Sequence, residues 1–155
     1  MISEKLNSWL TLAANVGVIA GIVFLAIEIR QNSDAVRAQT KAQLAEGVTE
    51  LFSVNMNDKE YASVLMRGNN LEDLTPVEQY QYYRHRSAWV HYWNNVAYQY
   101  EMGMYDESEF ELQISTIRAD METFPGLKVH WCNNKDSASK RLVESIEGDQ
   151  LGEYC

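Results

Sequence analysis

The strongest feature of the hydrophobic pattern is an uncharged stretch from Trp9 to Ile27, which is closed by Glu28-Ile29-Arg30. As an α-helix these residues would extend ~28 Å, close to the thickness of a bilayer's hydrocarbon core. Apolar residues lie on every face of that helix, which is typical of membrane spans and rare in soluble proteins. The pattern therefore predicts a transmembrane helix over about residues 5–30, with Trp9 and Arg30 at the membrane edges.

Two other interpretations of this stretch are less favourable. A cleaved signal peptide would need a shorter apolar region and a small-x-small cleavage site, whereas the stretch continues into LAIEIRQN. A buried helix of a soluble protein stays open as an alternative, because Thr11, Asn15 and two glycines dilute the hydrophobicity. The length of the uncharged run favours the span.

The rest of the chain shows helical periodicity and no sustained alternation of the kind that predicts strands. Residues 32–57 are predicted to form a juxtamembrane helix, either as a new helix capped at Asn32-Ser33-Asp34 or as a continuation of the span. Leu44, Val48, Leu51 and Phe52 share one face, so the second half of this helix is expected to pack against something. Residues 58–155 are predicted to form an acidic helical domain.

Local signals divide that domain into helices. Asn57-Asp58 begins a short helix that is expected to end at Arg67, with Gly68 as the residue after its C-terminus. Thr75-Pro76-Val77-Glu78 is a capping box, and it predicts an aromatic-rich helix that runs to about Met102. Further helices are predicted from Asp106 or Glu107, after the break at Phe124-Pro125-Gly126, and from Ser137 or Ser139, with a frayed tail over residues 149–155. The expected fold is all-α, a transmembrane helix continuing into a bundle of about five or six helices.

Small and polar residues inside the span suggest contacts with other helices. Ala13, Gly17 and Gly21 recur every four residues along one stripe, a spacing that lets two helix backbones approach closely in lipid. The Asn15 amide has no water at its depth and needs a hydrogen-bond partner on a neighbouring helix or a backbone carbonyl. Self-association is therefore expected, although glycine is also simply common in membrane helices.

Charge is distributed unevenly along the chain. Residues 1–41 carry four basic and three acidic side chains, and the remaining residues carry nine basic and nineteen acidic ones. Such an acidic domain repels phosphates, so nucleic acid is not an expected partner. Because Lys5 alone precedes the span and Arg30, Arg37 and Lys41 follow it, the positive-inside bias places the C-terminal domain in the cytoplasm.

The chain offers few candidates for chemistry. Cys132 and Cys155 do not form a disulfide framework by their number, and a reducing compartment is the simpler expectation. His130 and Cys132 are close in sequence, but the histidines and cysteines lack the spacing of a metal site, so neither metal nor cofactor is expected. No glutamate has a histidine three residues on, and no GxSxG, P-loop or GxGxxG motif occurs.

One catalytic hypothesis survives. Arg86 and His91 have the R-x4-H spacing seen in HEPN-type ribonucleases, which are also all-helical. If this resemblance held, Arg86 would stabilise the phosphate and His91 would act as general acid and base at the RNA 2′-hydroxyl. The acidic surface opposes it, and one such pair arises easily by chance, so the chain is not expected to be an enzyme.

The stretch LTLAANVGVIAGIVFLAIEIRQN, followed by an Ala/Gln-rich helix, resembles a broad group of uncharacterised bacterial single-pass membrane proteins. The resemblance continues through Asn95–Tyr100 with Gly103, and through Phe124-Pro125-Gly126 to Trp131. It implies the bacterial cytoplasmic membrane and no particular activity. The expected function is a membrane-anchored scaffold, sensor or assembly module that self-associates through its span, its protein partner unknown. A homo-oligomeric pore is the related alternative.

Overall fold

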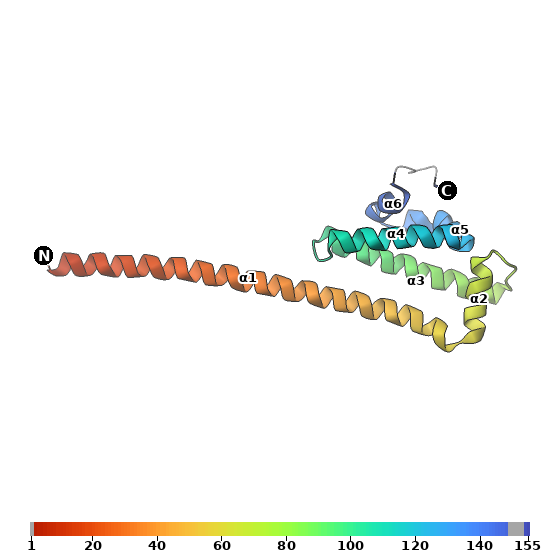
Figure 1. The fold of residues 1–155 in the computed structure, drawn as a ribbon, viewed down its shortest axis with the longest axis horizontal. Helices are drawn as coiled ribbons and strands as arrows, with labels where there is room; N and C mark the ends of the chain where they lie inside the picture. Colours follow the sequence, from red (N-terminus) through yellow and green to blue (C-terminus); the bar gives the residue numbers. More distant parts are fainter. Residues whose placement is uncertain (1, 149–153) are drawn as a thin grey trace. The chain divides into compact units, whose positions relative to one another are not determined.

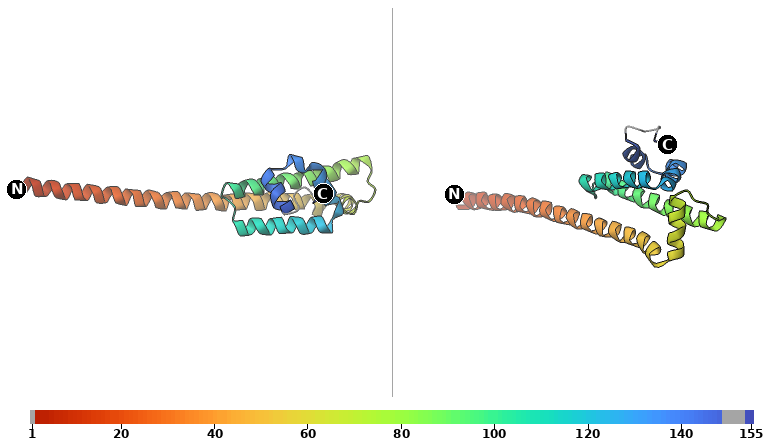
Figure 2. Two further views of the ribbon diagram at one scale, coloured as in Figure 1. Left: turned by 90° about the horizontal axis from the view of Figure 1, so that it is seen from above. Right: turned by 45° about the vertical axis from the view of Figure 1, so that its right-hand side comes forward.

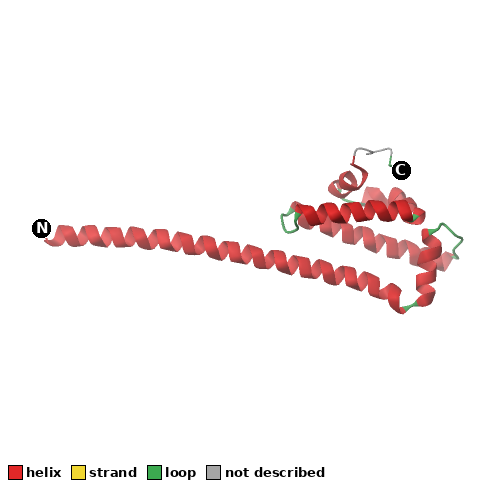
Figure 3. Ribbon diagram, viewed as in Figure 1, coloured by secondary structure: helices red, strands yellow, loops and turns green. Residues whose placement is uncertain are grey.

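The computed structural model describes residues 2–148 and 154–155, and the regular elements in these ranges are all helical (Figure 3). This confirms the all-α fold predicted from sequence, with a long apolar N-terminal helix that continues into a helical region. The chain divides into two compact units, Met1–Gln39 and Thr40–Cys155. The helices are α1 (Ile2–Asn57), α2 (Lys59–Asn69), α3 (Pro76–Glu101), α4 (Glu107–Thr123), α5 (Pro125–Asn134), a 3-10 turn (Lys135–Ser137) and α6 (Lys140–Glu147).

The first unit is the N-terminal part of α1. Its side chains are exposed from residue 3 to residue 39, including the large apolar ones between Trp9 and Ile29. In the described part of the chain, α1 is the one helix that is long and apolar enough to cross a membrane. It passes Asn32-Ser33-Asp34 without interruption, so these residues do not cap a new helix.

The second unit takes in the last turns of α1. Leu44 is buried in the core of this unit, and the ring of Phe52 meets Trp89 edge to face at 5.1 Å. The Lys41 ammonium lies 2.7 Å from an Asp106 carboxylate oxygen and 3.0 Å from one of Glu109. The compact unit therefore begins at Thr40 rather than at the predicted boundary of residue 58, because the apolar face of residues 44–52 packs with it.

Side-chain caps set the starts of α2 and α3. The Asp58 carboxylate accepts hydrogen bonds from the backbone N–H groups of Glu60 and Tyr61. Thr75 and Glu78 form the predicted capping box, and Glu78 also pairs with the Arg67 guanidinium. These bonds, that to Arg67 above all, lower the pKa of the Glu78 carboxyl to about 2. Each cap satisfies backbone donors that the first helical turn leaves without partners.

The prediction that α2 ends at Arg67 was wrong, because the helix continues through Gly68 to Asn69. Gly68 is buried, and a Cβ atom there would lie 2.3 Å from the Tyr82 ring. A Cβ on Gly126, in the first turn of α5, would lie 2.0 Å from the carbonyl oxygen of Gly68. The two glycines therefore serve close backbone contact between α2 and α5, and Gly68 is not a helix-terminating residue.

The remaining helices enclose one hydrophobic core. Helices α3 and α4 run in opposite directions side by side, and both contact α5 and α6 (Figures 1 and 2). The Trp131 indole, fully buried on α5, donates a 3.3 Å hydrogen bond to Glu147, whose carboxylate also pairs with Lys135 at 2.8 Å. The largest fully buried side chains are Trp131, Phe110, Ile114, Ile117, Met121, Leu142, Ile146 and Val96.

The glycine contact between α2 and α5 generates a test of the packing. Gly126→Ala forces a methyl group against the Gly68 carbonyl, and we expect a loss of more than ~2 kcal/mol in the free energy of unfolding. Gly47→Ala is the matched control, because its new Cβ would meet only Tyr92, at 4.0 Å. There we expect a gain of up to ~1 kcal/mol from helix propensity. Urea unfolding followed by tryptophan fluorescence measures both, and equal effects would contradict the contact.

Candidate functional site

The candidate interface residues of the span lie on a single uninterrupted helix. At roughly 100° per residue, Ala13, Gly17 and Gly21 form one stripe, and Asn15 lies roughly 160° around the axis from both Ala13 and Gly17. A Cβ atom added to either glycine would meet nothing within 4 Å. Among the described residues the Asn15 side chain has no hydrogen-bond partner. The stripe and the polar residue therefore belong to opposite faces, a separation that the sequence spacing implies and the unbroken helix preserves.

The predicted membrane-edge residues are both exposed on the same helix. Trp9 is 70% exposed, and Arg30 lies ~32 Å further along the axis at 1.5 Å per residue. That separation matches the thickness of a bilayer's hydrocarbon core. The assignment of Trp9 and Arg30 to the membrane edges stays a prediction.

The structure does not bring Arg86 and His91 together. Five residues apart on α3, they lie roughly 140° from each other around the helix axis, and His91 is exposed. The Arg86 guanidinium instead donates to the Asn69 side-chain oxygen and lies over the Tyr82 ring, 5.3 Å from its centroid. No hydrogen bond joins Arg86 to His91 in the described part of the chain, and the ribonuclease hypothesis stays a prediction from the R-x4-H spacing.

Arg86 belongs to a cleft of about 620 Å³ within the second unit, which we call the Arg86 cleft. Its walls are largely apolar and aromatic, and its polar groups come from α2, α3 and α4. The side chains that line the cleft include Phe52, Asn69, His85, Arg86, Trp89, Trp93, Thr116, Asp120 and Phe124. Its volume is in the range of pockets that hold small molecules.

Burial shifts the pKa values of two groups that line this cleft, His85 and Asp120. Burial, assisted by the positive charge of Arg86, lowers the pKa of His85 to about 4. The Trp89 indole N–H donates to His85 Nε2 at 3.0 Å, as a neutral imidazole with its proton on Nδ1 allows. Burial also raises the pKa of the Asp120 carboxyl. Arg86 is therefore the cation of the cleft at neutral pH, and its buried Nε has no hydrogen-bond partner among the residues that the structure describes.

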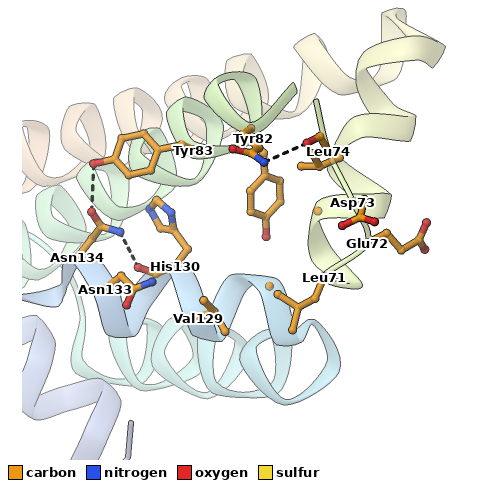
Figure 4. A pocket seen from close by; sticks show the side chains of 13 residues that line it. Leu71, Glu72, Asp73, Leu74, Tyr82, Tyr83, Val129, His130, Asn133 and Asn134 are labelled. Carbon is orange, nitrogen blue, oxygen red and sulfur yellow. Dashed lines mark hydrogen bonds between the residues drawn. The ribbon is translucent and has the colours of Figure 1, made fainter. Parts of the chain in front are cut away.

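A second, more polar cleft of about 430 Å³ lies beside α5, and we call it the His130 cleft (Figure 4). His130 is 6% exposed, and within residues 2–148 and 154–155 its buried Nε2 has no hydrogen-bond partner. The Tyr83 ring covers it edge to face at 5.1 Å, and the Tyr83 hydroxyl donates to Asn134 at 3.1 Å. Burial, assisted by the charge of Arg86, lowers the pKa of His130 to about 4. Glu72 and Asp73 line the outer part of this cleft and are exposed.

The two cysteines form a disulfide, with Cα atoms 5.6 Å apart. The sequence-based expectation of a reducing compartment does not accommodate this pair, because disulfides persist mainly in oxidising compartments. Spacing along the chain could not indicate the pairing, since the bond depends on how α5 and the C-terminal residues fold back on each other. The predicted frayed tail falls largely on residues 149–153, which lie outside the described residues. Tyr154 itself packs on Lys128, whose ammonium is 4.5 Å from its ring centroid.

Sequence reasoning missed both clefts. The groups that meet in the Arg86 cleft are spread from Phe52 to Phe124, and no short motif connects them. The paired basic residues His85 and Arg86 within an aromatic-rich helix were the one available signal. Among the described residues, no group of three or more His, Cys, Asp or Glu side chains is arranged to hold a metal ion. The groups that line the clefts offer hydrogen bonds, one partly buried positive charge and apolar contact.

Lowering the pH from 7.5 to 5 is expected to destabilise the second unit through His85 and His130. Both stay neutral in the folded state down to about pH 4, whereas their ordinary pKa is 6.5. Their stabilising contribution is complete above pH 6.5 and is lost as the pH falls towards 4, because the unfolded chain binds the proton more readily. Each histidine should remove on the order of 2 kcal/mol of unfolding free energy by pH 5, measured by urea titration.

Three substitutions test that assignment. His85→Gln and His130→Gln should each make the stability less dependent on pH in this range. His91→Gln, at an exposed position on α3, should leave the dependence as it is. A dependence that survives both buried substitutions would contradict the role of these two histidines.

Comparison with known proteins identifies no relative of this chain. No protein-family model, no curated protein and no solved structure matches the chain.

Proposed function

We propose that this chain is a single-pass membrane protein that self-associates through its span and uses the second unit as a scaffold, sensor or assembly module. The observation that carries the proposal is the surface of α1 up to residue 39, where apolar side chains are exposed on every face. Exposed apolar patches of that extent are covered in stable proteins by lipid or by a partner. The length and composition of the helix fit lipid.

Self-association follows from what lipid leaves unsatisfied. Lipid tails cover Leu, Ile and Val well, but they cannot hydrogen-bond the Asn15 amide. A second helix against Ala13, Gly17 and Gly21 gains backbone contact that bulkier residues would prevent. More than one further copy of the same span can meet both needs, one copy packing on the stripe and another accepting the Asn15 hydrogen bonds. The resemblance described above supports the bacterial cytoplasmic membrane as the location.

A ring of copies around a pore is the second candidate. It is favoured by the placement of Asn15 roughly 160° from the stripe residues Ala13 and Gly17. One face of each span would then pack on a neighbour while the other turned Asn15 towards a second neighbour or a lumen. A simple dimer through the stripe would leave Asn15 facing lipid.

Two features of the chain favour opposite sides of the membrane for the second unit. Arg30, Arg37 and Lys41 favour the cytoplasm, but Glu28 and Asp34 are interspersed among them. The disulfide between the cysteines favours an oxidising compartment. We give more weight to the disulfide, because the charge bias amounts to a few residues, and we propose that the second unit faces away from the cytoplasm.

The stripe is tested by enlarging one of its residues. Gly17→Leu should weaken association at least about tenfold, because the added side chain separates the two backbones. Native mass spectrometry and cross-linking of the full chain in mild detergent and in lipid nanodiscs measure the oligomer. Val23→Phe is the matched control, since residue 23 lies roughly 80° or more around the axis from the stripe and from Asn15. A monomeric wild type, or an oligomer that Gly17→Leu leaves intact, would refute the proposal.

The side of the membrane is tested through Cys155, whose sulfur becomes a free thiol when Cys132 is replaced. Wild-type chain from cells quenched with acid should show no free thiols. In Cys132→Ser, a membrane-impermeant maleimide added to spheroplasts should label Cys155, which is exposed. Labelling only after the membrane is permeabilised, together with two free thiols in the wild type, would place the unit in the cytoplasm instead.

A further inference from the structure

The Arg86 cleft combines largely apolar walls with one partly buried cation, the Arg86 guanidinium. Trp89 and Trp93 line it from α3, and Phe124 lines it from the end of α4. Phe52 lines it from α1 and packs on Trp89 at 5.1 Å. Aromatic walls of this kind bind flat or extended apolar groups, while a few polar groups fix their orientation.

The guanidinium of Arg86 has more donors than the described residues satisfy. It can donate five hydrogen bonds, and its side-chain acceptor is the Asn69 oxygen. The Tyr82 ring covers one face of the guanidinium, 5.3 Å away. Among the described residues the buried Nε atom has no hydrogen-bond partner. An acceptor that enters the cleft would meet the guanidinium at its terminal N–H groups, which can donate further hydrogen bonds.

The chain's own carboxylate does not fill that role. Asp120 lines the same cleft, but no ion pair joins it to Arg86 among the described residues. Burial raises the pKa of the Asp120 carboxyl, while the positive charge of Arg86 lowers it. His85 is neutral at physiological pH and hydrogen-bonded to Trp89. A ligand that pairs with Arg86 therefore brings its negative charge into a cleft that already contains Asp120.

We propose that the Arg86 cleft is a binding site for a small organic monocarboxylate with an apolar body, held by the Arg86 guanidinium and the aromatic side chains around it. The carboxylate geometry matches the forked donors of arginine. A dianionic phosphate fits less well, because the cleft offers one cation and also contains Asp120. This proposal does not depend on how the span associates.

Octanoate is a suitable probe, with octylammonium and octanol as ligands of the same length but different head group. Isothermal titration of the full chain in nanodiscs, with the signal of empty nanodiscs subtracted, should show saturable binding of octanoate at least about tenfold tighter than of the other two. Equal binding of the three, or no saturable binding of octanoate, would overturn the proposal.

Matched variants locate the site. Arg86→Gln should weaken octanoate binding at least about tenfold, whereas Arg84→Gln, at an exposed position on the same helix, should not change it. Thr116→Trp offers a second test that keeps Arg86, because a bulky side chain at this exposed position should fill the cleft. Thermal unfolding checks that each variant is folded. Wild-type affinity in a folded Arg86→Gln or Thr116→Trp protein would refute the site.

Discussion

A helix whose apolar side chains point in every direction cannot be covered by one neighbouring element, and this constraint governs the molecule. Between Trp9 and Ile27 the backbone groups are satisfied within α1, so lipid can surround it without leaving unpaired N–H or C=O groups. The second unit has its own core, contained within Thr40–Cys155. The second unit therefore buries its apolar side chains in its own core, whereas those of the first unit are exposed from residue 3 to residue 39.

Local chemistry made several elements predictable. The capping box at Thr75 and Glu78 marks the start of α3, because both partners of its hydrogen bonds lie within four residues. The same reasoning failed at Gly68, which has the position of a helix terminator but is used for contact with Tyr82 and Gly126. A glycine that ends a helix and a glycine that allows close packing look the same in the sequence. Which role applies depends on an element more than fifty residues later in the chain, which local patterns do not encode.

The clefts illustrate the same limit for function. The sequence spacing relates Arg86 to His91, whereas the structural neighbours of Arg86 are Asn69 on α2 and Tyr82, which lies one turn earlier on α3. Its positive charge also contributes to the low pKa of His85 and of His130, which line different clefts. One guanidinium is therefore shared electrostatically between two sites. An anion that neutralised it in one cleft would favour protonation of the histidine in the other.

The bond between Cys132 and Cys155 has a consequence for how the last helix can open. It closes a loop of sequence separation 23 that contains α6. In a chain-entropy description, a loop of that size restricts the unfolded ensemble by about 3 kcal/mol. If Leu142 and Ile146 leave the core in a local fluctuation, the covalent tether keeps α6 near α5. Helix α6 then rejoins the core from within a short closed loop, at high effective concentration. This part of the core can therefore open and reclose while α6 stays close to its packing site.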